Sequence, residues 1–224
     1  MKIGGLQQLS LIDYPRRLSC IIFTMGCNLR CPYCYNPDLV KETAAEIPEE
    51  YIFKFLDERK DLLDAVVITG GEPTIHPDLP EFMEKIKTKG FLIGLETNGT
   101  NPEMLEKLLE DGLVDYIGMD IKAPLEKYKE IAGVEINPEK LRKSIRIVMN
   151  SQREYEFRTT CYPKLKEEDF QGIFRLIEGA KKYTLQQFSP ERTLAESPKP
   201  YPQEFLKGLK EKARKHFTEV NLRL

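Results

Sequence analysis

Short apolar runs alternate with longer stretches of helical pattern along most of the chain. Alternation of this kind predicts βα units, in which helices connect parallel strands and cover the sheet. Several of the runs are almost continuously apolar, as in strands that are buried on both faces. We expect six strands, at residues 20–24, 65–69, 92–97, 116–121, 156–160 and 184–188.

Helical stretches lie between these strands and after the last of them. We expect helices at residues 49–58, 79–88, 103–110, 139–149, 167–180 and 203–216, followed by a short strand-like segment at 219–224. Asn101 is a suitable N-cap for the third helix, Pro102 suits its first turn, and Gly112 is a suitable stop. Periodicity alone leaves two architectures open, a doubly wound sheet and a barrel.

The length and composition are those of an ordinary globular protein with a single domain, residues 1–224. The proline-rich stretch 197–202 indicates a surface loop, because too little chain follows it to form a second domain. A formal net charge of -2 gives no electrostatic case for nucleic acid or an anionic membrane as a partner. No apolar run approaches the ~20 residues that span a bilayer, and residues 1–17 lack the apolar core of a signal peptide. We therefore expect a cytoplasmic protein in a reducing compartment.

Three cysteines, Cys27, Cys31 and Cys34, lie in one short loop directly after the first expected strand. Thiolates suit iron–sulfur clusters, zinc or copper(I), and three of them leave one coordination position for another ligand. A zinc site completed by a remote residue, or a disulfide with a spare thiol, is the alternative, although disulfide frameworks are typical of small secreted chains. Cys20 has the character of a small buried hydrophobe, and we expect neither it nor Cys161 to be a ligand.

The spacing Cys-x-x-x-Cys-x-x-Cys, with Tyr33 before the last cysteine, resembles the cluster loop of the radical S-adenosylmethionine (SAM) superfamily. Residues 9–15 (LSLIDYP) and 23–37 (FTMGCNLRCPYCYNP) are similar to one branch of it, the anaerobic ribonucleoside-triphosphate reductase activating proteins. The resemblance implies a radical SAM core, which is an α/β fold with parallel strands in an open partial TIM barrel, (β/α)6. Barrels of this kind place their active-site residues at the carboxyl ends of the strands.

The same resemblance implies two cofactors, a [4Fe–4S] cluster and SAM. Cys27, Cys31 and Cys34 would be the metal ligands and would hold three irons, while SAM would chelate the fourth. Tyr33 would be among the residues that bind the cofactor.

Glycines and an asparagine follow the second and third expected strands. The pair Gly70 and Gly71, before Glu72, permits close approach of the backbone to a ligand, although such pairs are also common in turns. The resemblance implies that this Gly-Gly-Glu-Pro backbone receives the methionine ammonium group of SAM. It also implies that Asn98 hydrogen-bonds the ribose.

Asp120 and Lys122 end the fourth expected strand, and alternation places them on the same side of it. A similar Asp-x-Lys in the pyruvate formate-lyase activating enzymes implies that Lys122 lies near the SAM carboxylate. It also implies a monovalent cation near Glu96, Thr97 and Asp120. A salt bridge at the strand end is the simpler alternative.

Two further polar residues lie on the last two expected strands. Arg158 is unusual for a covered strand, and the resemblance implies that its guanidinium pairs with the SAM carboxylate. The resemblance also implies that Gln187 touches the adenosyl group, whereas a polar neighbour of the core is an equally good interpretation of this residue.

The chemistry implied by the resemblance is a reductive cleavage of SAM to methionine and a 5′-deoxyadenosyl radical, which generates a glycyl radical on anaerobic ribonucleoside-triphosphate reductase. An external electron donor, such as flavodoxin or ferredoxin, is implied as a second partner. Another substrate for the radical is the alternative: pyruvate formate-lyase or another glycyl-radical enzyme, a small molecule, or RNA. Tyr35 stands where many members have histidine, and this departure weakens the assignment of a particular substrate. A non-catalytic zinc-binding module is the alternative from a different class.

Overall fold

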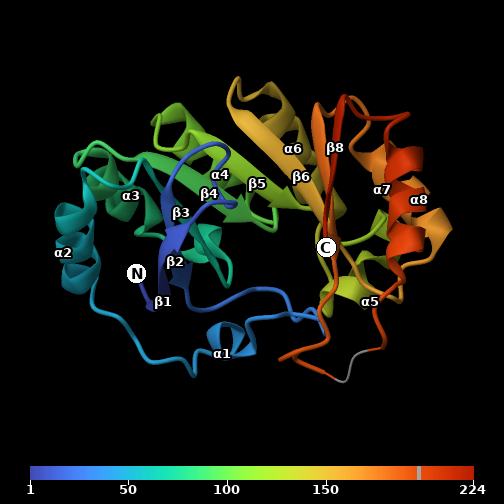
Figure 1. Cartoon of the computed structure of the whole chain (residues 1–224), viewed down its shortest axis with the longest axis horizontal. Helices are drawn as coiled ribbons and strands as arrows, with labels where there is room; N and C mark the ends of the chain where they lie inside the picture. The colour runs from blue at the N-terminus through green and yellow to red at the C-terminus, as the bar shows by residue number, and fades with distance from the viewer. Residues whose placement is uncertain (196–197) are drawn as a thin grey trace.

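The computed structural model describes residues 1–195 and 198–224, and the described strands form one continuous curved sheet (Figure 1). The strands follow one another across the sheet in chain order. They are β1 (Ile3–Ser10), β2 (Ser19–Thr24), β3 (Ala65–Gly70), β4 (Leu92–Thr97), β5 (Tyr116–Asp120), β6 (Glu154–Cys161), β7 (Lys182–Gln187) and β8 (Glu219–Arg223). The proline-rich stretch expected as a surface loop begins at Ser197, which lies outside the described residues.

Strands β2 to β8 are parallel, which confirms the six expected strands and the strand-like segment that follows them. Strand β1 is an addition and pairs antiparallel with β2, from Ile3 opposite Thr24 to Ser10 opposite Ser19. We did not predict β1, because its sequence, IGGLQQLS, has neither an apolar alternation nor a continuous apolar run.

The helices connect the strands. They are α1 (Pro37–Val40), α2 (Glu49–Arg59), α3 (Leu79–Lys87), α4 (Pro102–Glu110), α5 (Tyr128–Ala132), α6 (Pro138–Asn150), α7 (Glu167–Leu176) and α8 (Gln203–Ala213), with 3₁₀ turns η1 (Pro73–Ile75) and η2 (Leu125–Lys127). The short helices α1 and α5 were not predicted, because so few residues show no helical period. Helix α7 is shorter than the expected 167–180, because Ile177 leaves helical geometry and Gly179 has a φ of 86°.

The sheet curls into a barrel. The barrel is open, because the edge strands β1 and β8 do not pair with each other in the part of the chain that the structure describes. Helices α3, α4, α6, α7 and α8 lie on its outer side (Figure 1). Strand residues such as Val66, Ile93 and Ile117 are fully buried in the same core as Phe82 of α3 and Leu105 of α4. The expected partial barrel with parallel strands is therefore confirmed.

The amino-terminal end of the barrel is closed by a small apolar cluster. It consists of Tyr14, Ile21, Ala65, Val67 and Tyr116. The Tyr14 ring, from the loop between β1 and β2, lies 5.5 Å from the Tyr116 ring at the start of β5. The carboxyl ends of the strands are left for the connecting loops, which position the polar residues discussed below. No helix among the described residues is long and apolar enough to cross a membrane.

Asn101 performs the capping role expected for it, and we predict a measurable cost for its removal. Its side-chain oxygen accepts a hydrogen bond from the Met104 amide, and its nitrogen donates to the Thr74 carbonyl at 2.6 Å. Asn101→Ala should lower the free energy of unfolding by about 1–2 kcal/mol, measured by urea denaturation. Asn150→Ala, at the last residue of α6, is the control; an equal loss in both variants would contradict this role for Asn101.

Candidate active site

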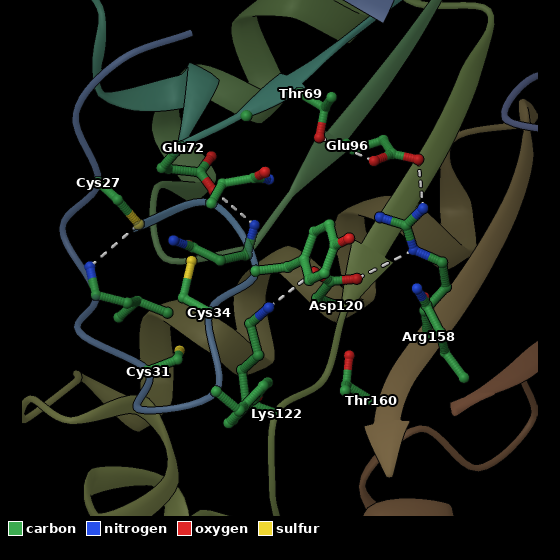
Figure 2. Close-up of a pocket in the computed structure, with 18 of the residues that line it drawn as sticks. Cys27, Cys31, Cys34, Thr69, Glu72, Glu96, Asp120, Lys122, Arg158 and Thr160 are labelled. Atoms are coloured by element: carbon green, nitrogen blue, oxygen red, sulfur yellow. Dashed lines mark hydrogen bonds and ion pairs between the residues drawn. The ribbon is translucent and has the colours of Figure 1, made fainter. Parts of the chain in front are cut away.

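A cavity of about 290 Å³ opens at the carboxyl ends of the strands. Every site residue expected from the sequence lines it. These residues are Cys27, Cys31, Tyr33, Cys34, Gly70, Gly71, Glu72, Asn98, Asp120, Lys122, Arg158 and Gln187. They come from the loop after β2 and from the ends of β3 to β7, so the shared orientation of the parallel strands brings them together (Figure 2).

The loop that carries the three cysteines is held by backbone contacts on two sides. On one side the Gly26 amide donates to the Leu39 carbonyl of α1 at 2.9 Å. On the other side the Arg30 amide donates to the Ala132 carbonyl of α5 at 2.9 Å. Helix α5 then ends at Gly133, where a Cβ atom would lie 2.2 Å from the Arg30 carbonyl oxygen. The loop is therefore packed in place before any ligand is considered.

The three thiols face the cavity without disulfide partners. Burial raises the pKa of Cys27 to about 12 and also raises the pKa of Cys31, so a bound metal is needed to stabilise the thiolates. Soft thiol donors facing one cavity suit an iron–sulfur cluster. Within residues 1–195 and 198–224, no three His, Cys, Asp or Glu side chains are grouped so that they could hold a single metal ion.

The other two cysteines lie away from this cavity. Cys20 is fully buried in the main core, as expected from its place in a strand. The Cys161 thiol is also fully buried and lies 3.8 Å from the Thr159 carbonyl oxygen.

The two glycines after β3 bring the backbone against the start of the cysteine loop. A Cβ atom on Gly71 would lie 1.8 Å from the Gly26 carbonyl oxygen, and Gly70 has a φ of 112°. The Gly71 amide donates to Thr24 at 2.8 Å, and the Glu72 amide donates to Gly26 at 2.9 Å. The close approach expected at this pair is therefore made first to the protein's own backbone.

The Glu72 side chain joins the ends of β3 and β4. It is 1% exposed, and its carboxylate accepts hydrogen bonds from the Thr74 amide and hydroxyl, from the Thr97 hydroxyl at 2.6 Å and from the Asn98 amide at 2.7 Å. Burial raises the pKa of Glu72, although these hydrogen bonds favour the charged form. This role of Glu72 in joining two strands was not predicted, because a Glu after Gly-Gly is typical of an exposed turn.

Asn98 connects the end of β4 to the cysteine loop. Its side-chain nitrogen Nδ2 donates to the Asn28 side-chain oxygen at 2.9 Å, and its side-chain oxygen Oδ1 accepts from the Thr100 hydroxyl at 2.6 Å. Asn28 in turn donates to the Thr100 hydroxyl at 2.7 Å. Part of the hydrogen-bonding capacity expected to serve a ligand is thus used within the protein.

A row of four charged side chains and one threonine crosses the cavity wall from β3 to β6 (Figure 2). Lys122 donates to Asp120 at 2.7 Å, and Arg158 donates through Nε to the other oxygen of Asp120 at 3.0 Å. Arg158 also pairs through Nη1 with Glu96, whose second oxygen accepts from Thr69 at 2.9 Å. We define five residues as the charged row: Thr69, Glu96, Asp120, Lys122 and Arg158.

The charges of the row favour one another. Burial opposes the charged form of Asp120, but Lys122 and Arg158 outweigh it and lower the Asp120 pKa to about 2. Burial likewise opposes the charged form of Lys122, but Asp120 holds its pKa well above the usual value. Both groups are therefore charged at neutral pH.

The residues expected around a monovalent cation are already bonded to other protein groups. All four carboxylate oxygens of Glu96 and Asp120 already accept from Thr69, Lys122 or Arg158. The Thr97 hydroxyl donates to Glu72. The ion pair of Asp120 with Lys122 is the salt bridge given above as the alternative, whereas the contacts of Arg158 were not predicted, because they depend on the register of three strands.

Two polar atoms in the cavity wall have no hydrogen-bond partner among the described residues. They are the Tyr33 hydroxyl, on a ring stacked 4.7 Å from Tyr162, and the side-chain oxygen of Gln187. Unsatisfied buried polar atoms are rare in proteins and are suited to contact a ligand.

Four residues near the cavity were not predicted. Asp13 and Arg223 line it from the loop after β1 and from β8. Asn28 supports Asn98, and the ring of His76 bonds the Met25 carbonyl at 2.9 Å, just before the cysteine loop. His76 is half-buried.

Comparison with known proteins gives a consistent family. Residues 21–177 match the model of the radical SAM superfamily. A Methanocaldococcus jannaschii protein described as a glycyl-radical enzyme activating enzyme is 36% identical over 230 residues, which cover 99% of this chain and 95% of the relative. A 7-carboxy-7-deazaguanine synthase of Aquifex aeolicus is 30% identical over 192 residues, 84% of this chain and 77% of the relative.

Solved structures share the fold. Streptococcus suis SuiB bound to S-adenosylmethionine matches with a TM-score of 0.72 and 16% identity, over 90% of this chain and 49% of SuiB. The chain thus spans about half the length of SuiB. From the family match, the near full-length relative and the shared barrel, we conclude that the chain belongs to the radical SAM superfamily, whose enzymes use a [4Fe–4S] cluster and SAM.

Proposed function

We propose that this enzyme activates a glycyl-radical enzyme, and that its partner is anaerobic ribonucleoside-triphosphate reductase. The observation that carries the proposal is the meeting of three free thiols and the polar strand ends in one open cavity. When bound, the cluster supplies one electron for the cleavage of SAM to methionine and a 5′-deoxyadenosyl radical, which takes a hydrogen atom from a glycine Cα of the partner. Flavodoxin or ferredoxin is the proposed electron donor.

The three cysteines are the proposed cluster ligands. Cys27, Cys31 and Cys34 offer three soft donors, so one iron is left for the amino and carboxylate groups of SAM. Because burial disfavours the free thiolates of Cys27 and Cys31, binding of the cluster should release their protons.

The proposed SAM contacts follow from the chemistry of each strand end. The backbone at Gly70 and Gly71 is suited to the ammonium group, with Glu72 as the residue that positions it. Lys122 keeps two of its three ammonium donors after bonding Asp120, and these can bind the SAM carboxylate.

The remaining contacts are proposed for the nucleoside. Asn98 is placed on the ribose. The unpartnered atoms of Tyr33 and Gln187 are suited to the adenosyl group, since a ligand there would satisfy both. Arg158 was expected to pair with the SAM carboxylate, but its Nε and Nη1 are bonded to Asp120 and Glu96. It contributes its charge from within the row and is the subject of the next subsection.

The open barrel supports a macromolecular substrate. The cavity opens at the carboxyl ends of the strands, and a radical must be shielded from solvent while it reacts. A flexible loop of a partner enzyme can enter and close such an opening. We further propose that residues 1–224 act as one domain, since the sheet takes strands from both halves of the chain.

A small-molecule substrate is the second candidate. The relative from Aquifex aeolicus supports it, because it is a 7-carboxy-7-deazaguanine synthase that covers most of this chain. The same cysteine loop and SAM site would serve either reaction, so the fold does not discriminate between them.

Anaerobic reconstitution with iron and sulfide, followed by electron paramagnetic resonance, tests the proposal. A reduced [4Fe–4S] signal that changes on adding SAM is expected, followed by a glycyl-radical signal when anaerobic ribonucleoside-triphosphate reductase is added. Absence of a cluster would return the three cysteines to the zinc alternative. A SAM-responsive cluster without a glycyl radical on any candidate partner would favour the small-molecule reaction.

Removal of each proposed cluster ligand should abolish SAM cleavage. Cys27→Ala, Cys31→Ala and Cys34→Ala each leave an iron without its protein ligand, so iron content and 5′-deoxyadenosine formation should fall to background, measured by iron assay and chromatography. Cys20→Ala is the matched control, because this thiol is buried in the core away from the cavity. Loss of the cluster in the Cys20 variant would contradict the ligand assignment.

Glu72→Gln should destabilise the protein without removing any cluster ligand. The amide would place hydrogen-bond donors against the donors of Thr97 and Asn98, at an expected cost of about 1–3 kcal/mol in the free energy of unfolding. Chemical denaturation measures this cost, with the exposed Glu84→Gln as the control. Equal stability of the two variants would show that the buried carboxylate is not required to join β3 and β4.

A further inference from the structure

We propose that the guanidinium of Arg158 acts as the permanent cation of the cavity, so that SAM binds without an alkali metal ion. The proposal rests on the SAM site described above, but not on the identity of the partner enzyme. It follows from the contacts of Arg158, from the space made for it and from the charge balance of the row.

Arg158 lies between the only two acidic side chains of the charged row. Its Nε bonds one oxygen of Asp120 at 3.0 Å, and its Nη1 pairs with Glu96. The parallel register explains this position, because Arg158 of β6 lies beside Asp120 of β5, and Glu96 of β4 lies one strand further along the sheet. A guanidinium presents several donors in a fixed plane, so one side chain can satisfy two carboxylates as a bound ion would.

The neighbouring strand leaves room for this side chain. Gly118 of β5 faces it, and a Cβ atom there would lie 3.2 Å from Arg158 Cζ and 3.3 Å from Nη1. The Arg158 side chain is only 8% exposed, so solvent screens its charge weakly. Glycine at this position therefore favours a buried guanidinium beneath the cavity.

The charge balance of the row is complete without an added ion. Glu96 and Asp120 carry two negative charges, and Arg158 and Lys122 carry two positive charges. An alkali ion would add an uncompensated positive charge beside the charged groups of Arg158 and Lys122, which would repel it. Without Arg158, one negative charge would be left over, and a small cation could then neutralise it.

The ion pair of Arg223 with Glu156 does not change this charge balance. Arg223 also lines the cavity, but it is bonded to Glu156 at 2.7 Å, and the second oxygen of Glu156 accepts from Thr184 at 2.8 Å. That pair is neutral by itself. Within the charged row, the requirement for a cation is therefore decided by Arg158.

The first test uses the wild-type enzyme with its cluster. The dissociation constant of SAM is measured anaerobically by isothermal titration in potassium, sodium or choline chloride at the same ionic strength, ~0.1 M. We expect the three values to agree within about twofold. Tightening by about tenfold or more in potassium or sodium over choline would overturn the proposal.

The second test uses thermal unfolding of the protein without cluster or SAM, so it remains informative even if the proposed SAM site fails. Arg158→Gln should gain about 3 °C or more in its midpoint when sodium or potassium replaces choline. Arg158→Gln combined with Glu96→Gln restores neutrality and should lose this gain. Arg192→Gln, which removes an exposed ion pair with Asp38, is the control.

The outcomes of the second test are distinct. A gain in the Arg158 variant alone supports the proposal. A gain of the same size in the wild type, or in all variants, overturns it, because the alkali ion would then act without regard to Arg158. If Arg158→Gln does not fold, the comparison of the three salts in the wild-type enzyme decides the proposal by itself.

Discussion

A backbone contact between Gly71 and Gly26 fixes the cysteine loop to the sheet, and the rest of the site depends on it. The Gly26 carbonyl accepts from the Glu72 amide, and not even a methyl group fits between the two backbone segments. This contact sets the position of Cys27 relative to the strand ends. The Glu72 carboxylate then joins β3 to β4. The geometry of the site is thus built by buried polar contacts that no ligand has to supply.

Most of the fold could be predicted, because the strands from β2 onward are apolar runs that alternate with helical patterns. Strand β1 could not, since glycines and glutamines dominate it and its pairing with β2 supplies its order. The residues that line the cavity could be named from motifs at strand ends. Their mutual pairing could not, because the contact of Arg158 with Glu96 depends on strand register and on the space at Gly118.

Polar groups in the cavity wall fall into two kinds. Glu72, Asn98 and Asp120 are largely occupied with other protein groups and provide a rigid frame. Tyr33 and Gln187 carry atoms without partners among the described residues, and they are the ones a ligand would complete. A wall of this composition is pre-organised, so little reorganisation is needed on binding.

The unpaired edges of the sheet have a mechanical consequence. In a closed barrel the ladder of hydrogen bonds fixes the diameter, because every strand has two neighbours. Here β1 and β8 are not joined to each other in the described chain, so no ladder of hydrogen bonds between them fixes the curvature of the sheet. The width of the cavity entrance is then set by side chains and by the substrate that enters, so one fold can admit substrates of different size.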